Sequence, residues 1–165
     1  MNQPNNQPDF LPNIHKWASL IIAAVYSETG EFLGFVFVFD PNKNDPRHKL
    51  PGGRKKPIHI DKNSPSETAR REMGEETGLW FPLEIFKEFT EIREWRTFPE
   101  KHWLFTYIIK VKESEIIGMN SDEPGNEDEI PGYYTLAQTK KLVKNDKFLS
   151  VHYKKILAAV KLKLL

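Results

Sequence analysis

Cysteine is absent from the 165 residues of this sequence. Its absence excludes disulfide bonds, thiolate nucleophiles and zinc sites with sulfur ligands. Because a chain without disulfides suits a reducing compartment, we expect a cytoplasmic location. Long apolar runs are missing as well, since the longest fall far short of the roughly 20 residues that cross a bilayer. We therefore expect a soluble protein with no membrane partner.

A large net charge is also lacking. The 24 Lys and Arg residues nearly balance the 23 Asp and Glu residues, so no overall field attracts the chain to nucleic acid. We expect a small-molecule partner and no nucleic acid. Residues 1–13 are mostly Asn, Gln and Pro without a signal sequence, and they predict a flexible N-terminal arm. The remainder suits a single domain, residues 14–165, and whether it forms a homodimer is left open.

Two strongly apolar segments, residues 17–26 and 32–39, predict β-strands joined by a hairpin loop. Because both are apolar almost throughout, they indicate a sheet that helices cover on both faces. Further strands are predicted at 83–92, 103–111 and 130–135, and helices at 136–144 and 149–164. In the last helix, core residues are expected at helical spacing: Leu149, Tyr153, Ile156, Leu157, Val160 and Leu164.

A short helix is predicted between Ser64 and Gly78. Ser64 with Glu67 three residues later matches a capping box, and Pro65 suits the first helical position. Gly78 suits a left-handed cap at the C-terminal end. The turn 50–53, Leu-Pro-Gly-Gly, precedes this helix and lets the backbone approach a ligand closely.

Three carboxylates share one face of this helix. Glu72, Glu75 and Glu76 fall within an arc of about 100° at 3.6 residues per turn. Like charges at this spacing destabilise a helix by roughly 0.2 to 0.5 kcal/mol per pair, so a purely structural helix has little reason to cluster them. A divalent cation supplies a reason, because Mg²⁺ binds carboxylates together with substrate phosphates. The alternative is a solvated face in which Arg71 compensates Glu75.

The turn and the helix together resemble the Nudix box, G-x5-E-x7-R-E-U-x-E-E-x-G-U, in which U is apolar. Every fixed position of its second half is matched, by Arg71, Glu72, Met73, Glu75, Glu76, Gly78 and Leu79. The first half departs from the pattern, since nine residues instead of five follow Gly53, and the next aligned position is Asn63 instead of Glu. The loop is therefore four residues longer and lacks one negative charge. His59 and Asp61 lie within it as isolated further candidates.

The resemblance implies an α/β (α+β) fold, a Nudix-type α/β/α sandwich with a mixed β-sheet. It also implies a pyrophosphohydrolase that cleaves the diphosphate linkage of a nucleoside diphosphate derivative. The substrate class includes nucleoside triphosphates, nucleotide sugars, ADP-ribose and dinucleotides, and the implied cofactor is Mg²⁺ or Mn²⁺. By the same resemblance, the metal ligands are the backbone carbonyl of Gly53 and the side chains of Glu72, Glu75 and Glu76.

Catalytic roles also come from the resemblance. Glu75 is expected to act at the metal directly or through water, and Arg71 to hold a glutamate by bidentate hydrogen bonds. A glutamate of the acidic loop serves as the base, and Glu127 is our choice over Glu129. Because the amide of Asn63 adds no charge, we expect weaker binding at one metal position.

Substrate contacts are predicted on both sides of the helix in sequence. Arg54 and Lys55 follow the glycine turn, where they either contact phosphate or form a solvated loop. Trp95 beside Arg96 either stacks on a nucleobase or packs at the edge of the sheet.

Two other functions are compatible with the same resemblance. Asn63 and the lengthened loop favour a non-catalytic nucleotide-binding module as the alternative. The diphosphate isomerase branch of the fold resembles a cysteine-dependent chemistry, and the absence of cysteine argues against it.

Overall fold

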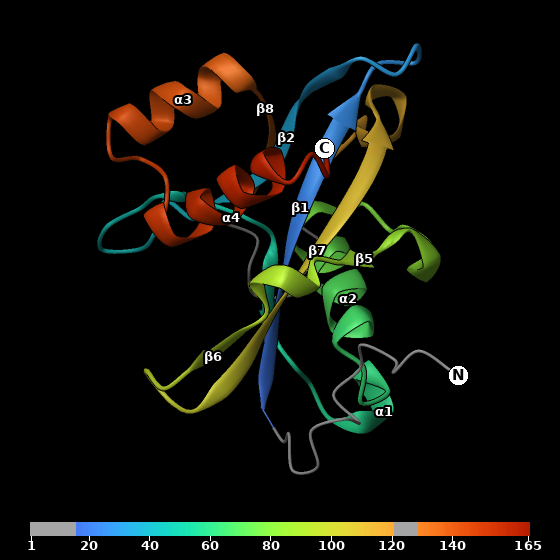
Figure 1. The fold of residues 1–165 in the computed structure, drawn as a ribbon, viewed down its shortest axis with the longest axis vertical. Helices are drawn as coiled ribbons and strands as arrows, with labels where there is room; N and C mark the ends of the chain where they lie inside the picture. The colour runs from blue at the N-terminus through green and yellow to red at the C-terminus, as the bar shows by residue number, and fades with distance from the viewer. Residues whose placement is uncertain (1–15, 121–128) are drawn as a thin grey trace.

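The computed structural model describes residues 16–120 and 129–165, which form a mixed β-sheet flanked by helices (Figure 1). The predicted arm at 1–13 lies outside the described residues, and so does Glu127. Within the described part of the chain, no helix has the length and apolar character needed to cross a membrane.

Three long strands form the centre of the sheet: β1 (Trp17–Tyr26), β2 (Phe32–Phe39) and β7 (His102–Lys112). β1 pairs with β7 in parallel and with β2 antiparallel, so the sheet is mixed. The main path through the sheet is β3-β2-β1-β7-β5. The shorter strands are β3 (His48–Lys49), β4 (Gly52–Arg54), β5 (Lys87–Glu88), β6 (Glu94–Arg96) and β8 (Ile130–Thr135). Each of them pairs antiparallel with a long strand.

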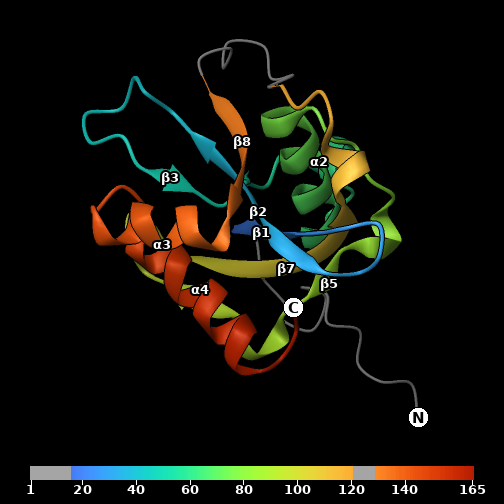
Figure 2. The same cartoon turned by 90° about the horizontal axis from the view of Figure 1, so that it is seen from above.

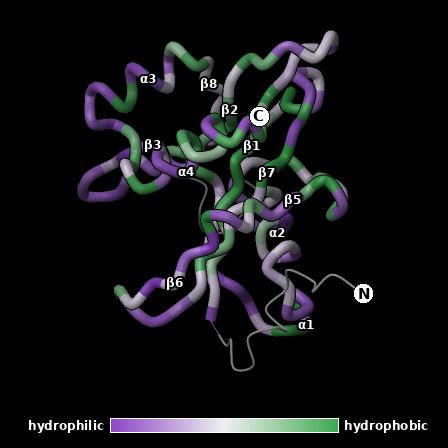
Figure 3. The backbone as a smooth tube through the Cα atoms, viewed as in Figure 1, coloured by the Kyte–Doolittle hydropathy of each residue, from purple (hydrophilic) through white to green (hydrophobic). Residues whose placement is uncertain are grey.

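The side chains of β1 alternate between two hydrophobic clusters, because successive residues of a strand point to opposite faces of the sheet. Ile21 and Val25 lie in one cluster, and Leu20 and Ile22 lie in the other. Hydrophobic residues accordingly follow one another along the middle of β1, whereas β6 at the rim is mostly hydrophilic (Figure 3). The burial of the first two predicted strands on both faces is confirmed.

Helices cover the two faces of the sheet (Figure 2). They are α1 (Ile58–Asp61), α2 (Pro65–Thr77), α3 (Leu136–Lys144) and α4 (Ser150–Lys161). α2 packs Ala69 and Met73 against one face, while α4 packs Ile156 and Ala159 against the other, on the same side as α3. The predicted mixed-sheet α/β/α sandwich is confirmed.

α2 begins and ends where the sequence predicts. The hydroxyl of Ser64 accepts a hydrogen bond from the backbone N–H of Glu67 at 3.4 Å. Gly78 ends the helix with a φ of 72°, in the left-handed region that favours glycine. The carboxylate of Glu67 pairs with Lys62 and Arg70. Ser64 therefore caps the helix, whereas the side chain of Glu67 forms ion pairs instead of completing the capping box.

The strand predicted at 83–92 is wrong over most of its length. The 3₁₀ turns η2 (Leu83–Ile85) and η3 (Thr90–Ile92) flank β5, whose two residues alone of this segment pair with β7. Pro82 precedes the first turn, and apolar and polar residues alternate poorly along the segment, so little of it suits a strand. β6 and α1 are additional short elements that the sequence pattern does not indicate.

α4 is shorter than the predicted helix at 149–164, and its buried face is rotated. Leu157 and Val160, expected in the core, are 49% and 53% exposed, while Ile156 and Ala159 are buried. The wide apolar stripe of this helix allows either orientation, and contacts with the sheet select one of them.

The loop between β4 and α2 is held by the buried carboxylate of Asp61. Arg71 donates to both of its oxygens, from Nε at 2.7 Å and from Nη2 at 3.2 Å. The hydroxyl of Thr68 and the backbone N–H of Lys56 also donate to Asp61, at 2.8 and 2.6 Å. Burial acts to raise the pKa of Asp61, but these donors hold it below its usual range.

The turn at 50–53 is tied to α4 by a histidine. Nδ1 of His152 accepts a hydrogen bond from the backbone N–H of Leu50 at 3.1 Å. Burial, together with the nearby cations Lys49, Lys155 and Arg96, lowers the pKa of His152 to about 3. The imidazole is therefore neutral at physiological pH, as an acceptor at Nδ1 requires.

Replacing Asp61 with Ala is expected to destabilise the protein by about 3 kcal/mol or more, because it leaves the buried Arg71 without its bidentate partner. Asn63→Gly is the control, since Asn63 already has a φ of 52° that glycine adopts without strain, and it should change stability by less than about 0.5 kcal/mol. Urea unfolding followed by circular dichroism measures both. Equal effects of the two substitutions would contradict the anchoring role of Asp61.

Acid should destabilise the wild type more than His152→Gln, whose amide oxygen can still accept from Leu50. The folded pKa of His152, about 3, lies below the unfolded value of about 6.5, so the unfolded state binds more protons between these pH values. Stability attributable to His152 is thus complete above pH 6.5 and falls by up to about 1.4 kcal/mol per pH unit below it. Urea unfolding of both proteins at several pH values tests this, and parallel pH profiles would refute it.

Candidate functional site

The acidic face of α2 packs directly against the glycine turn at the start of β4. The backbone N–H of Gly52 donates to Oε2 of Glu76 at 2.9 Å. A Cβ atom on Gly53 would lie only 2.6 Å from the carboxylate of Glu72, so a larger residue there would displace this carboxylate. The structure therefore brings together Gly53, Glu72 and Glu76, three of the four metal ligands that the resemblance implies.

Arg71 lies at the centre of a buried charge network. Its Nη1 contacts Glu72 at 2.8 Å and Glu75 at 2.7 Å, and its Nη2 donates to the backbone carbonyl of Arg54 at 2.9 Å. Burial acts to lower the pKa of Arg71, but its carboxylate partners raise it above the usual value. We expected Arg71 to form bidentate hydrogen bonds with a glutamate. In the structure its bidentate partner is Asp61, whose two carboxylate oxygens accept from Nε and Nη2.

Asp61, which the sequence indicated only as an isolated candidate, is a central partner of Arg71 in the structure. It lies two positions before Asn63, inside the lengthened loop, and restores the negative charge that the aligned position lacks. α1 ends at Asp61 and turns its carboxylate towards Arg71. In the sequence, the role of Asp61 was indicated only by its place two positions before Asn63, where the motif has a glutamate.

Glu75 remains beside the network at its more open end. It pairs with Arg71 and, at 3.2 Å, with Nζ of Lys56. Its side chain is more accessible than those of Glu72 and Glu76. Glu75 is thus the member of the acidic face closest to solvent.

Glu76 belongs to a second group of buried charges with Lys49 and Glu129. Nζ of Lys49 contacts Oε1 of Glu76 at 3.2 Å and Oε1 of Glu129 at 3.0 Å. Burial raises the pKa of Glu76, and repulsion from Glu129 and Glu72 adds to this effect, although Lys49 and the N–H of Gly52 oppose it. Glu129, the second match for the base, is therefore buried at the acidic face, while Glu127 lies outside the described residues.

The donor set suits a hard divalent cation. Glu72, Glu76 and Glu129 are buried carboxylates, and Oε2 of Glu129, although buried, has no hydrogen-bond partner in the described part of the chain. Among residues 16–120 and 129–165, however, no three carboxylate or imidazole side chains already converge as ligands of one metal ion. Arg71 and Lys49 instead hold these carboxylates. The chemistry of the residues fits Mg²⁺ or Mn²⁺, and binding requires the ion pairs to rearrange.

Arg54 and Lys55 line a basic hollow of about 270 Å³ next to the glycine turn, with Lys16, Trp17, Glu100 and His102. Nζ of Lys55 lies 4.7 Å from the ring centre of Trp17. Arg54 donates to Glu100 at 2.6 Å, and Lys16 contacts the other oxygen of that carboxylate at the same distance. The carboxylate of Glu100 thus pairs with two cations that could otherwise bind an anionic ligand.

Trp95 and Arg96 do not line that hollow, and their side chains have different surroundings. Trp95 is 48% exposed and packs against Trp103, with ring centres 5.4 Å apart. Arg96 contacts Glu94 and lines a second hollow of about 380 Å³ near the start of α4. Because neighbouring strand residues face opposite sides, the two side chains do not form one binding surface.

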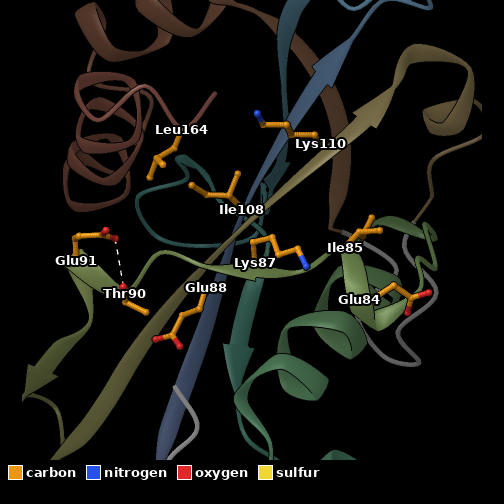
Figure 4. A pocket seen from close by; sticks show the side chains of 9 residues that line it. All are labelled: Glu84, Ile85, Lys87, Glu88, Thr90, Glu91, Ile108, Lys110 and Leu164. Atoms are coloured by element: carbon orange, nitrogen blue, oxygen red, sulfur yellow. Dashed lines mark hydrogen bonds between the residues drawn. The ribbon is translucent and has the colours of Figure 1, made fainter. Parts of the chain in front are cut away.

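A larger hollow of about 590 Å³ lies at the outer edge of the sheet and includes Ile108 and Leu164 (Figure 4). Its other lining residues are Glu84, Ile85, Lys87, Glu88, Thr90, Glu91 and Lys110. Acidic residues outnumber the lysines, which does not favour an anionic ligand. None of the residues of the acidic face lines it, so the charge networks of α2 remain the candidate site.

Known proteins provide an independent comparison. Curated proteins give no match to this sequence. The NUDIX domain of Shewanella oneidensis NrtR, complexed with ADP ribose, has a TM-score of 0.62 at 14% identity, over 90% of this chain and 88% of that chain. A Francisella tularensis bifunctional NMN adenylyltransferase/ADP ribose pyrophosphatase, complexed with AMP and a Mn ion, has a TM-score of 0.59 at 15% identity, over 87% and 41% of the two chains.

A third similar structure is a MutT/nudix family protein from Enterococcus faecalis, with a TM-score of 0.53 at 17% identity. The match covers 73% of this chain and 43% of that one, so the chain spans less than half the length of this relative. At such identities these likenesses show the fold alone. A family model described as NUDIX domain matches residues 16–155, a range that contains the glycine turn and the acidic helix. By this match over most of its length, the chain belongs to the NUDIX domain family.

Proposed function

We propose that the chain is a metal-dependent hydrolase that cleaves the diphosphate linkage of a nucleoside diphosphate derivative. The observation that carries this proposal is the burial of Glu72 and Glu76 against a turn that only glycine permits. Such clustered carboxylates destabilise a fold unless they bind a cation. Similar structures that hold ADP ribose, or AMP with a Mn ion, support the substrate class and the cofactor.

The chain supplies the ligands and their orientation. Glu72, Glu76 and the carbonyl of Gly53 would hold Mg²⁺ or Mn²⁺, and Glu129 adds a fourth oxygen donor. When bound, the metal neutralises charge that develops on the diphosphate and makes water more acidic. Arg71 positions Glu72 and Glu75 through its two contacts and is itself fixed by Asp61.

Glu75 and Glu127 are the proposed groups for water activation. Glu75 is the most accessible carboxylate of the acidic face and is oriented by Arg71 and Lys56. A general base must reach the attacking water by a hydrogen bond, and the open end of the network suits that requirement. Glu127 stays a prediction from the family resemblance, because it lies outside the described residues.

The basic hollow beside Gly53 is the proposed place for the anionic part of the substrate that lies away from the metal. Lys16, Arg54 and Lys55 provide positive charge there, and a phosphate would compete with Glu100 for Lys16 and Arg54. Trp95 keeps half of its surface exposed and is a proposed stacking surface for a base. Arg96 lies in the other hollow and would contact a more distant part of the ligand.

A second candidate function is a non-catalytic nucleotide-binding module. The observation that favours it is that Lys49 and Arg71 already form ion pairs with Glu72, Glu76 and Glu129. A module of this kind would bind a nucleotide tightly and leave it intact.

The hydrolase proposal predicts turnover in a screen of nucleotide sugars, dinucleotides, nucleoside triphosphates and ADP-ribose with Mg²⁺ or Mn²⁺. Glu76→Gln should lower kcat on the best substrate by at least about a hundredfold, because it removes a charged metal ligand. Phosphate release or chromatographic detection of the products measures the rate.

Glu67→Gln is the matched control, since Glu67 lies on the same helix but pairs with Lys62 and Arg70. Its activity should stay within about twofold of the wild type. Full activity of Glu76→Gln would show that the mechanism is wrong. Tight nucleotide binding by calorimetry, without cleavage over hours in the presence of metal, would favour the module.

A further inference from the structure

The ammonium group of Lys49 lies between two buried carboxylates that come from different parts of the fold. Lys49 belongs to β3, Glu76 to the last turn of α2, and Glu129 directly precedes β8. The side chain of Lys49 is 16% exposed, and those of Glu76 and Glu129 are each 4% exposed. The three charges are therefore shielded from water, where an ion pair is stronger and an unpaired charge costs more.

The ammonium satisfies this carboxylate pair only in part. It contacts one oxygen of Glu76 and one oxygen of Glu129, and Oε2 of Glu129 has no hydrogen-bond partner among the residues that the structure describes. Lysine offers a compact charge with three donors, whereas a divalent cation carries twice the charge and binds several oxygens at once. The carboxylate oxygens of Glu76 and Glu129 could therefore bind a cation of higher charge than the ammonium group of Lys49.

The two ion-pair networks on the acidic face of α2 contain more carboxylates than cations. Asp61, Glu72, Glu75, Glu76 and Glu129 provide five carboxylates, whereas Lys49, Lys56 and Arg71 provide three cations. Arg71 is fixed by Asp61 and by the carbonyl of Arg54, whereas the partly buried Lys49 can move on its flexible side chain.

We propose that Lys49 is the resident counter-cation of the metal site, which holds Glu76 and Glu129 together in the metal-free protein and must leave when a divalent cation binds. This inference rests on the proposed metal-dependent function and adds a residue that sets how strongly the metal is bound. In the metal-free state Lys49 prevents repulsion between the two carboxylates. During metal binding it competes for the same oxygens, so the affinity for the metal is lower than the carboxylates alone would give.

The competition predicts that removal of the Lys49 charge tightens metal binding. Lys49→Met and Lys49→Gln should bind Mn²⁺ roughly tenfold more tightly than the wild type, the effect of a nearby unit charge in a partly buried site. Lys49→Arg keeps the charge and should bind with nearly wild-type affinity. Lys112→Met is the matched control, because Lys112 is an exposed lysine that pairs with Glu28 on another part of the fold.

The test is a titration of Mn²⁺ into the metal-free full chain without nucleotide, followed by calorimetry and by electron paramagnetic resonance of free Mn²⁺. Thermal unfolding with and without Mn²⁺ gives a second readout, in which the metal should raise the Tm of Lys49→Met and Lys49→Gln more than that of the wild type. Thermal unfolding can also be measured for a variant that has low stability without metal.

The possible outcomes separate this inference from the proposed function. The inference is supported if Lys49→Met and Lys49→Gln bind Mn²⁺ more tightly than the wild type, while Lys49→Arg and Lys112→Met do not. Equal affinities in all variants, or weaker binding without Lys49, would overturn it and leave the metal-dependent hydrolase intact. If neither the wild type nor any variant binds Mn²⁺, both the inference and the proposed function are wrong.

Discussion

Burial of negative charge is the constraint on which the rest of this structure depends. α2 turns Glu72 and Glu76 towards the sheet, where an unpaired carboxylate costs several kcal/mol. The surrounding elements are arranged to balance that charge. The lengthened loop brings Asp61 under Arg71, so that the guanidinium can hold two glutamates, and β3 brings Lys49 between Glu76 and the residue before β8. The glycine turn completes the arrangement, because it allows close approach and donates a backbone N–H.

The sequence predicted the central strands and α2 well because their signals are local. A serine cap, a terminal glycine and continuous apolar strands determine these elements almost without tertiary information. The segment 83–92 has no such signals, and only its two residues opposite β7 become a strand. The buried face of α4 also depends on tertiary contacts, since its apolar stripe is wide enough to place either Ile156 or Leu157 inside.

The sequence predicted only those residues of the candidate site that belong to one short motif. Glu72, Glu76 and Gly53 follow from one short motif, and the structure places them together. Arg71 belongs to the same motif, but Lys49, the cation that contacts Glu76, lies 27 positions before it and is not part of the motif. Asp61 was hidden for a different reason, because the insertion moves the compensating carboxylate off the aligned position. A missing charge in a motif therefore does not establish a missing charge in the site.

The central claim is that the acidic face of α2 is a metal site whose carboxylates are held by protein cations until the metal binds. Anomalous X-ray diffraction at the manganese edge, from crystals of the full chain grown with Mn²⁺, tests it most directly. We predict an anomalous peak within about 2.5 Å of carboxylate oxygens of Glu72 and Glu76, with Lys49 displaced from Glu76 and Glu129. A map without a peak at these carboxylates, in which Lys49 still contacts both of its partners, would contradict the claim.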